Sequence, residues 1–436
     1  MRHYPMRHYP LLLLSVALCM ASQPASAVRV RYTAELRAER NDNLLLDAEN
    51  PVDANILRPG VEFEVLQNDA ALQLTVGGRV HYYHYGVENV DNSVEALLEG
   101  RMNWDAIPGR LSFTIEDNMS MQPVDVLAAD IPGNRQRINI FSAGPTLHFH
   151  PGQATNGEMQ LRYVNTRAQT NDEFDSSRME FGLWIGRDLT PTDQLSGHVQ
   201  WQTVDFSTGG GAWDYKRSDL FARYRHRGAS LELMLDAGIT KLNYKDGSGD
   251  RDNPLFRLQS IWTPADDHRL ALRWSHQYSD VAAWAIDRTD GQLMPGGGMS
   301  LDLLVANGSP FVIRQIDLEY TFQRSRWSMA LLPYVNRLRY VDGSDFDYNG
   351  RGFSAEISYL PRENMRIGIG ASRDHNDYVV IGRDEDTRRY RLFVEHRFAR
   401  NWRAMLEASR YRRESNAFGQ NAKQGMVAIS LAYTNF

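Results

Sequence analysis

The sequence is poor in cysteine, in net charge and in long apolar runs. Cys19 is its only cysteine, and the net charge is −6. A chain with one thiol cannot form an internal disulfide, so a disulfide-stapled scaffold is excluded. So weak a net charge implies no strong electrostatic partner, and we expect no binding to nucleic acid.

The one long apolar run lies at the start of the chain. Arg2 and Arg7 precede the run from Leu11 to Ala21, and the small residues at 25–27 follow it. This order predicts a signal peptide over residues 1–27, removed together with Cys19. The remaining chain has no stretch long enough to cross a bilayer as a helix. The mean hydropathy of the whole chain, −0.48, is also too polar for helical spans.

Lysine is scarce as well. Only four of the 48 basic residues are lysine, so 44 are arginine. Arginine pairs with carboxylates through two parallel hydrogen bonds and donates to the paired oxygens of solutes. This composition suits a pore lined with arginine and acid, and it suits a path for a solute.

What the sequence has in abundance is alternation with a period of two. Leu231, Leu233 and Leu235 lie on one face of a predicted strand, with Glu232 and Asp236 on the other. Many later segments repeat this pattern, which is the period of a β-strand. In a soluble sandwich such apolar faces meet a second sheet, whereas in a membrane barrel they meet lipid.

The connections between these segments alternate between tight and long. Asn68-Asp69 and Arg227-Gly228 are tight, whereas 41–55, 281–310 and 374–386 are long and rich in polar residues. The alternation predicts an all-β, transmembrane, antiparallel up-and-down β-barrel over residues 28–436. We count about 20 strands, with 18 as the alternative. Both termini are then periplasmic, and the aromatic Phe436 on an alternating last strand is typical of bacterial outer-membrane barrels.

Strand parity predicts which charged side chains face the lumen. Most of them are expected to form charge ladders across neighbouring strands, and some to line a path for a sugar. The predicted lining residues are Arg162, Arg223, Arg225, Glu232, Asp236, Arg269, Arg273, Asp317, Glu319, Glu356, Arg389, Arg391, Glu395 and Arg397.

One loop carries a calcium-like pattern. Asp345, Asp347, Asn349 and Gly350, with Glu356 last, satisfy the spacing of a calcium-binding loop. The flanking segments read as strands instead of the helices such a loop needs, so a solvated hairpin tip is favoured. A looser calcium site at Asp345, Asp347 and Asn349 is the weaker alternative, and no other cofactor is expected.

The longest loop, 281–310, contains two apolar patches around Gly296-Gly297-Gly298. A long loop with apolar content seldom lies free in solvent. We predict that it folds inward and narrows the pore, with an external cap as the equal alternative.

Other features are weaker signals. Tryptophans near predicted strand ends are typical of interfacial girdles; they are Trp104, Trp184, Trp201, Trp262, Trp327 and Trp402. No serine lies in a recognisable nucleophile motif and no histidine spacing indicates a metal site. A membrane-embedded hydrolase is therefore the last of the hypotheses, and we expect no enzyme.

The N-terminal third resembles a known family. The matching features are the segments 38–46, 57–61 and 80–85, followed by Asp91-Asn92. Over about residues 28–150 they resemble the EpsX-like outer-membrane β-barrel porins encoded with exopolysaccharide and exosortase systems. The resemblance implies a channel for polysaccharide export.

These observations favour a non-enzymatic outer-membrane channel for export of an exopolysaccharide. The expected partners are outer-membrane lipid, the barrel-assembly machinery and periplasmic polysaccharide-export proteins. A general or oligosaccharide-selective uptake porin is the first alternative. A structural or adhesive barrel with an occluded lumen is the second.

Overall fold

The chain forms one closed antiparallel sheet. The computed structural model describes residues 28–435 except 209–212, 248, 285–308 and 342. The predicted signal peptide and Phe436 lie outside the described residues, as does most of the 281–310 loop. Within the described part, 20 strands form a single sheet, so the count of 20 is confirmed over the alternative of 18.

The strands are long and their connections mostly short. Two 3₁₀ turns, η1 (Pro132–Asn134) and η2 (Asp172–Phe174), lie within connections. The strands of the first half are β1 (Arg29–Asn41), β2 (Ala54–Asn68), β3 (Leu72–Tyr83), β4 (Ser93–Ile107), β5 (Leu111–Pro123), β6 (Arg135–Gly152), β7 (Thr155–Ala168), β8 (Ser176–Asp188), β9 (Asp193–Phe206) and β10 (Tyr215–Arg227). Those of the second half are β11 (Leu231–Tyr244), β12 (Asp250–Ala265), β13 (His268–Ser279), β14 (Phe311–Arg324), β15 (Trp327–Tyr340), β16 (Tyr348–Arg362), β17 (Met365–Tyr378), β18 (Arg383–Arg397), β19 (Trp402–Ser415) and β20 (Ala422–Thr434).

Each strand pairs with its sequence neighbours, and the first pairs with the last. β1 and β20 are antiparallel from Thr33 opposite Thr434 to Asn41 opposite Met426. The two threonine hydroxyls lie 2.8 Å apart at one end of this seam. Because the seam joins both edge strands, the sheet has no free edge.

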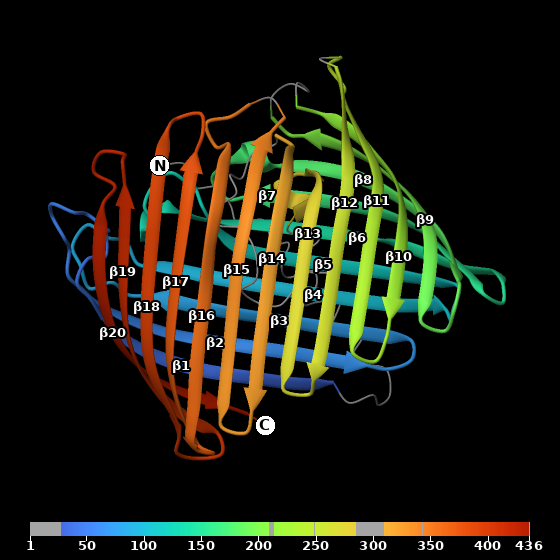
Figure 1. Cartoon of the computed structure of the whole chain (residues 1–436). Coiled ribbons are helices and arrows are strands. Elements are labelled where there is room, and N and C mark those ends of the chain that lie inside the picture. Colours follow the sequence, from blue (N-terminus) through green and yellow to red (C-terminus); the bar gives the residue numbers. More distant parts are fainter. Residues whose placement is uncertain (1–27, 209–212, 248, 285–308, 342, 436) are drawn as a thin grey trace.

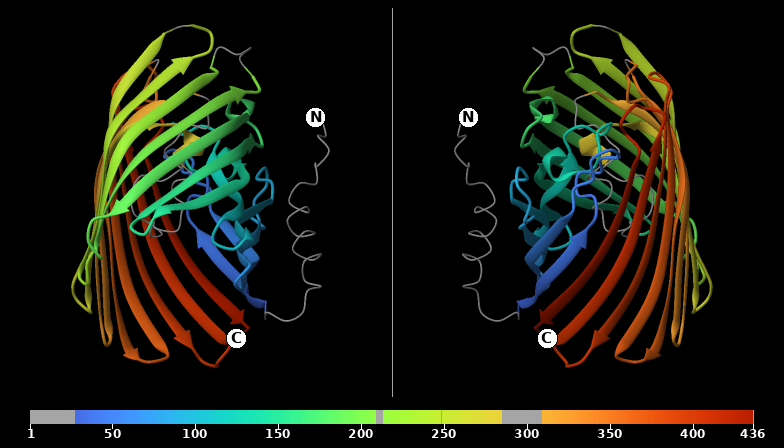
Figure 2. Two further views of the ribbon diagram at one scale, coloured as in Figure 1. Left: turned by 90° about the vertical axis from the view of Figure 1, so that its right-hand side faces the viewer. Right: turned by 90° about the vertical axis from the view of Figure 1, so that its left-hand side faces the viewer.

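The barrel has two facing walls whose strands cross. In Figure 1, β10 to β20 run steeply in the near wall, and β1 to β6 run nearly level behind them. The side views show the same two walls, blue to green and yellow to red (Figure 2). The inner faces of the two walls therefore face each other across the lumen.

The outer surface is apolar, as the period of two predicts. Leu220, Ile239, Ile316 and Val335 are each about half exposed or more, and they come from four different strands. Their sequence neighbours on the opposite face include buried polar groups such as Asp219 and Gln315. No helix in the described part of the chain is long and apolar enough to span a membrane.

Short and long connections alternate as expected, but some loops are shorter than predicted, most of all the one predicted at 374–386. β17 continues to Tyr378 and β18 begins at Arg383, so the predicted 374–386 loop shrinks to 379–382. Polar residues at 374–377 stay in the strand because they pair across to β16 and β18. The end of the barrel that carries the tight turns is called the turn end below, and the other is called the loop end.

Candidate functional site: the barrel lumen

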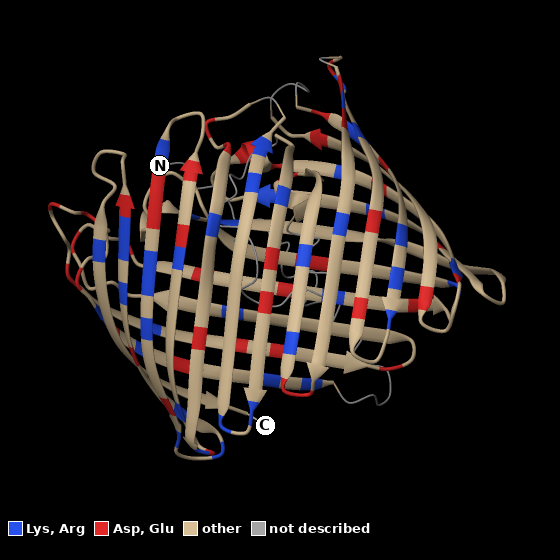
Figure 3. Ribbon diagram, in the orientation of Figure 1, with Lys and Arg blue, Asp and Glu red and all other residues tan. Residues whose placement is uncertain are grey.

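The predicted lining residues come from many strands on both sides of the barrel. Figure 3 shows charged residues recurring along the length of most strands, in rows that continue from one strand to the next. Charges inside a sheet need partners, because an unpaired buried charge is costly. The contacts of the inner face supply many of these partners.

The most buried charge of the lumen wall is Asp236. Its side chain is fully buried and accepts hydrogen bonds from Arg223, at 2.6 and 2.8 Å, and from Arg257, at 2.8 Å. Both guanidinium groups also lie over the ring of Phe221, with Arg257 4.7 Å and Arg223 5.6 Å from the ring centroid. Two cations on one carboxylate leave this patch of the wall with a net positive charge.

Further along the same wall, β13 to β18 carry several ladders of the predicted type. Arg269 pairs with Glu319 at 3.2 Å, and Arg273 with Asp317 at 3.6 Å. Arg391 lies 3.5 Å from Glu356, which is the last residue of the calcium-like pattern.

The remaining predicted residues differ in their partners. Arg391 also pairs with Glu407 at 2.8 Å, Glu395 with Arg403 at 3.7 Å, and Arg389 lies over Tyr411. Arg162 donates to the carbonyl of Pro145 and to the hydroxyl of Thr146. Arg225 and Glu232 lie on the same face of β10 and β11 as Arg223 and Asp236, and Arg397 is paired in register with Arg403 near the turn end.

An apolar cluster crosses the lumen toward the loop end. Ile138, Ile140 and Val164 come from β6 and β7. They join one buried cluster with residues of β14 to β17, which are not neighbours of β6 or β7 in the sheet. The bridge is made by the start of the longest loop, whose described residues Val281, Ala282 and Trp284 are 0–8% exposed. The β14–β17 members are Phe311, Ile313, Leu338, Tyr340, Tyr348 and Tyr378.

The prediction that this loop folds inward therefore holds for residues 281–284. They form one helical turn inside the barrel. Residues 285–308 lie outside the described part of the chain, and so does the predicted glycine triplet.

A buried ion pair fixes the base of this loop. Asp280 accepts hydrogen bonds from both terminal nitrogens of Arg178, at 2.9 and 3.0 Å. Tyr215 donates its hydroxyl to the same carboxylate at 2.6 Å, and the backbone N–H of Ala283 donates at 3.0 Å. Burial opposes the charge of Asp280, but Arg178 and these donors outweigh it and hold the pKa of Asp280 well below its usual range. We call Arg178, Tyr215 and Asp280 the loop anchor.

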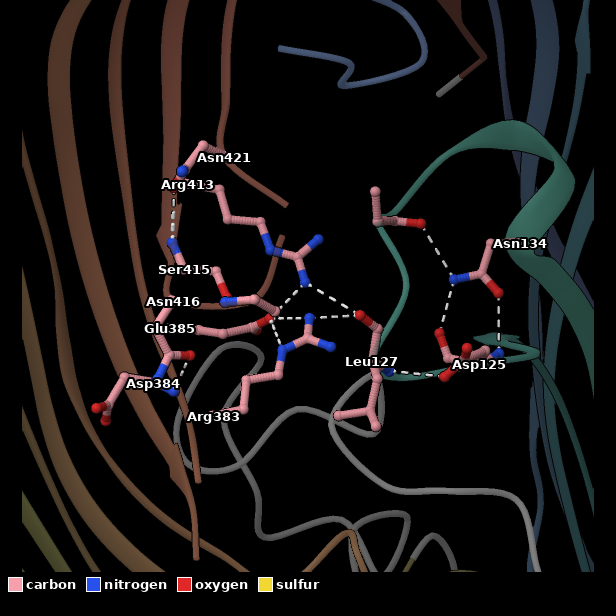
Figure 4. Close-up of polar contacts among 12 residues, drawn as sticks. Asp125, Leu127, Asn134, Arg383, Asp384, Glu385, Arg413, Ser415, Asn416 and Asn421 are labelled. Carbon is pink, nitrogen blue, oxygen red and sulfur yellow. Dashed lines mark hydrogen bonds and ion pairs between the residues drawn. The ribbon is translucent and has the colours of Figure 1, made fainter. Parts of the chain in front are cut away.

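A second connection reaches across the lumen from β5. The carbonyl of Leu127 accepts hydrogen bonds from Arg383 on β18 and from Arg413 on β19 (Figure 4). Glu385 pairs with both arginines and is 6% exposed. Asn134 holds the same connection in shape, donating to the carbonyls of Asp125 and Ala129 at 2.7 and 3.1 Å.

A polar cavity lies between the inward loop residues 281–284 and the turn end of the barrel. It has a volume of about 840 Å³ and reaches from Gly109 and His150 near the turn end to Ala283 of the inward loop. Its wall includes acids, bases, amides and the ring of Trp184. Trp184 donates to Glu158 in this wall, so its prediction as a girdle residue is wrong. Strand parity could have placed it correctly, since Trp184 is two residues from Gly182 and four from Glu180 on the lumen face.

The calcium-like residues make other contacts. Asp347 accepts a hydrogen bond from the backbone N–H of Tyr340 at 2.7 Å. The amide oxygen of Asn349 accepts from Arg339 at 2.7 Å and from Arg337 at 3.2 Å. No group of three or more His, Cys, Asp or Glu in the described residues is placed to hold a metal ion. Calcium binding at Asp345, Asp347 and Asn349 stays a prediction.

The loop anchor and the Leu127 contact were not predicted. Arg178 follows the same parity rule as the predicted lining residues, so its lumen position was accessible from sequence. Its partner Asp280 is 102 residues away, and no local pattern connects the two. Backbone contacts such as that of Leu127 leave no signal in a single sequence.

Comparison with known proteins supports the fold. No protein-family model matches the chain, and no curated protein matches it. The siderophore receptor PirA from Acinetobacter baumannii is similar with a TM-score of 0.50 and 11% identity, over 95% of this chain and 81% of that one. PirA from Pseudomonas aeruginosa gives 0.45 and 12%, over 95% and 81%. The outer membrane protein OpdK from Pseudomonas aeruginosa gives 0.36 and 9%, over 93% and 99%.

At these identities the similarity concerns the fold alone. The chain has the fold of an outer-membrane β-barrel.

Proposed function

We propose that this protein is an outer-membrane channel for a polysaccharide, with its lumen closed toward the loop end in the described conformation. One observation supports a closed lumen. An apolar cluster joins opposite walls through residues 281–284, on the loop-end side of a polar cavity. A barrel of about this strand number otherwise leaves an aqueous lumen.

The chemistry of the wall supports a hydrophilic solute. Arginine, carboxylate and amide groups line the cavity beside the ring of Trp184. Arginine binds hydroxyl and carboxylate oxygens, and an aromatic ring stacks on the apolar face of a sugar. The resemblance of residues 28–150 to EpsX-like porins supports export and the expected periplasmic partners.

A general or oligosaccharide-selective uptake porin is the first alternative, and a structural or adhesive barrel with an occluded lumen is the second. The closed cluster favours a gated channel or an occluded barrel over a permanently open pore. Release of the loop anchor distinguishes a gated channel from an occluded barrel. Only a gated channel gains conductance when the residues that obstruct its lumen are loosened.

The test is single-channel conductance of the refolded chain in planar bilayers. We expect little steady current from the wild type and frequent openings from Asp280→Ala. The control is Asp53→Ala, which removes an exposed ion pair with Arg40 at 3.3 Å near the loop end and should conduct like the wild type. Large steady wild-type currents would establish an open uptake porin, and silence in all three chains would favour the structural barrel.

The solute is tested separately, with proteoliposomes that hold labelled polysaccharide of graded length. Asp280→Ala vesicles should release chains that wild-type vesicles retain. Conductance without release of any oligosaccharide would contradict the polysaccharide assignment while leaving the channel intact.

A further inference from the structure

Three side chains on adjacent strands form a continuous hydrogen-bonded chain in the cavity wall. The hydroxyl of Ser112 lies 3.1 Å from Nε2 of His148. Nδ1 of the same ring lies 3.1 Å from Oε1 of Glu158. The three residues come from β5, β6 and β7, and all of them line the 840 Å³ cavity.

The environment of Glu158 fixes the direction of these hydrogen bonds. Its second oxygen accepts a hydrogen bond from the indole N–H of Trp184 at 3.0 Å. With a carboxylate at Nδ1, that nitrogen carries the proton, and Nε2 is left as an acceptor for the hydroxyl of Ser112. A serine that donates to a histidine held by a carboxylate is the arrangement that activates a hydroxyl for nucleophilic attack.

A cation lies on the same inner wall beside the serine. Arg162 donates to Thr146 at 2.7 Å and lies 3.4 Å from the hydroxyl of Thr114. Thr146 is paired in register with Ser112, and Thr114 is two residues further along the same face of β5. A guanidinium in this place can stabilise negative charge that develops on an oxygen attacked by Ser112.

We propose that Ser112, His148 and Glu158 form a hydrolytic triad that cleaves a short acyl ester on a polyhydroxylated solute inside the lumen. The polar wall around the triad selects a hydrophilic carrier with a small acyl group over a long-chain lipid. This activity does not depend on transport, since the cavity extends to the turn end of the barrel.

The reaction uses water as its only co-reactant. The oxygen of Ser112 bonds to the acyl carbon while its proton passes to Nε2 of His148, and the ester C–O bond breaks as that proton moves to the leaving hydroxyl. Water then attacks the acyl-serine, giving its proton to His148, and the carboxylic acid leaves as Ser112 regains a proton.

The barrel contains a matched control for this geometry. Ser196 lies 2.8 Å from Nε2 of His198, closer than Ser112 is to His148. His198, however, is stacked between the rings of Trp184 and Phe221. No carboxylate in the described residues accepts a hydrogen bond from it. Ser196 therefore has a base without the group that orients it.

The experiment uses the refolded full chain, a fluorophosphonate probe and p-nitrophenyl acetate. We expect the probe on Ser112 by peptide mass spectrometry, and acetate release that falls about 100-fold or more in Ser112→Ala and His148→Asn. Ser196→Ala should match the wild type. Circular dichroism and heat-modifiable migration in gels establish that each variant is folded, so rates are compared per folded molecule.

Glu158 has a positioning role, and its variants separate that role from structural support. Glu158→Gln should lower the rate at which the probe reacts with folded protein, and Glu158→Asp should restore part of it. A folded wild type whose Ser112 does not react with the probe would overturn the proposal. So would a reaction at Ser112 that is unchanged in His148→Asn.

Discussion

The guanidinium of Arg178 and the carboxylate of Asp280 form a two-point ion pair inside the barrel, although the residues are 102 positions apart in the chain. Their side chains are 1% and 4% exposed. The pair ties β8 to the start of the longest loop, at the level of the apolar cluster.

Removing one member of this pair should be far more damaging than replacing both. Asp280→Ala leaves a buried guanidinium without its carboxylate, and we expect a loss of about 3–5 kcal/mol in the free energy of unfolding. The double variant Arg178→Met, Asp280→Leu should lose less, because no uncompensated charge remains. Urea titrations of the vesicle-inserted protein measure both. A double variant as unstable as Asp280→Ala would contradict this account.

The loop anchor should resist mild acid. The pKa of Asp280 is depressed in the folded state, so its stabilisation is present above the unfolded value of about 3.9 and is lost as pH falls through the folded value. Protection factors of the amides at 280–284, which are corrected for the intrinsic pH dependence of hydrogen exchange, should therefore stay high from pH 8 to pH 5 and fall only in strong acid. In Asp280→Asn this pH dependence of the protection factors should vanish. A loss of protection in the wild type already at pH 6 would show that Asp280 is not the controlling group.

Glu385 should control the connection that carries Leu127. Glu385→Gln removes the negative charge between Arg383 and Arg413 and leaves the two cations adjacent, so we expect residues 125–131 to become sensitive to protease. The control is Glu414→Gln, since Glu414 pairs with arginines at the surface and is 41% exposed in its side chain. Equal protection in the two variants would mean that other contacts hold this connection.

Gly144 should tolerate no side chain. A Cβ there would lie 1.9 Å from the carbonyl oxygen of Leu161 and 2.9 Å from its carbon, both backbone atoms that cannot rotate away. Gly144→Ala should cost about 1–3 kcal/mol or more through forced movement of β7. Gly197→Ala is the control, because a Cβ added at Gly197 would have no neighbouring atom within 4 Å. Thermal denaturation monitored by gel migration compares the two.

The number of strands could be predicted, and so could the residues on the inner and outer faces of each strand. Both follow from a period of two and from turn chemistry. Ile316 is exposed on the outer surface and Asp317 is on the inner face, as their alternation indicates. The limits of β17 could not be predicted, because the polar residues 374–377 resemble a loop until their partners on β16 and β18 are known.

The candidate sites depend on register, which one sequence does not contain. Ser112, His148 and Glu158 meet because β5, β6 and β7 align at one level, and a shift of one residue would send His148 to the outer face. Parity correctly assigns Arg223 and Asp236 to one face, but it cannot tell that Arg257 shares the same carboxylate.

The seam between β1 and β20 sets the order of assembly. Every other pairing joins strands that follow one another, so it can form locally while the chain is incomplete. The seam joins residues about 400 positions apart, and contacts of such long range form late and slowly. Until then the folding protein has two open edges that could pair with another chain. Misassembly is thus most damaging at the last step, in which β1 pairs with β20 and closes the barrel.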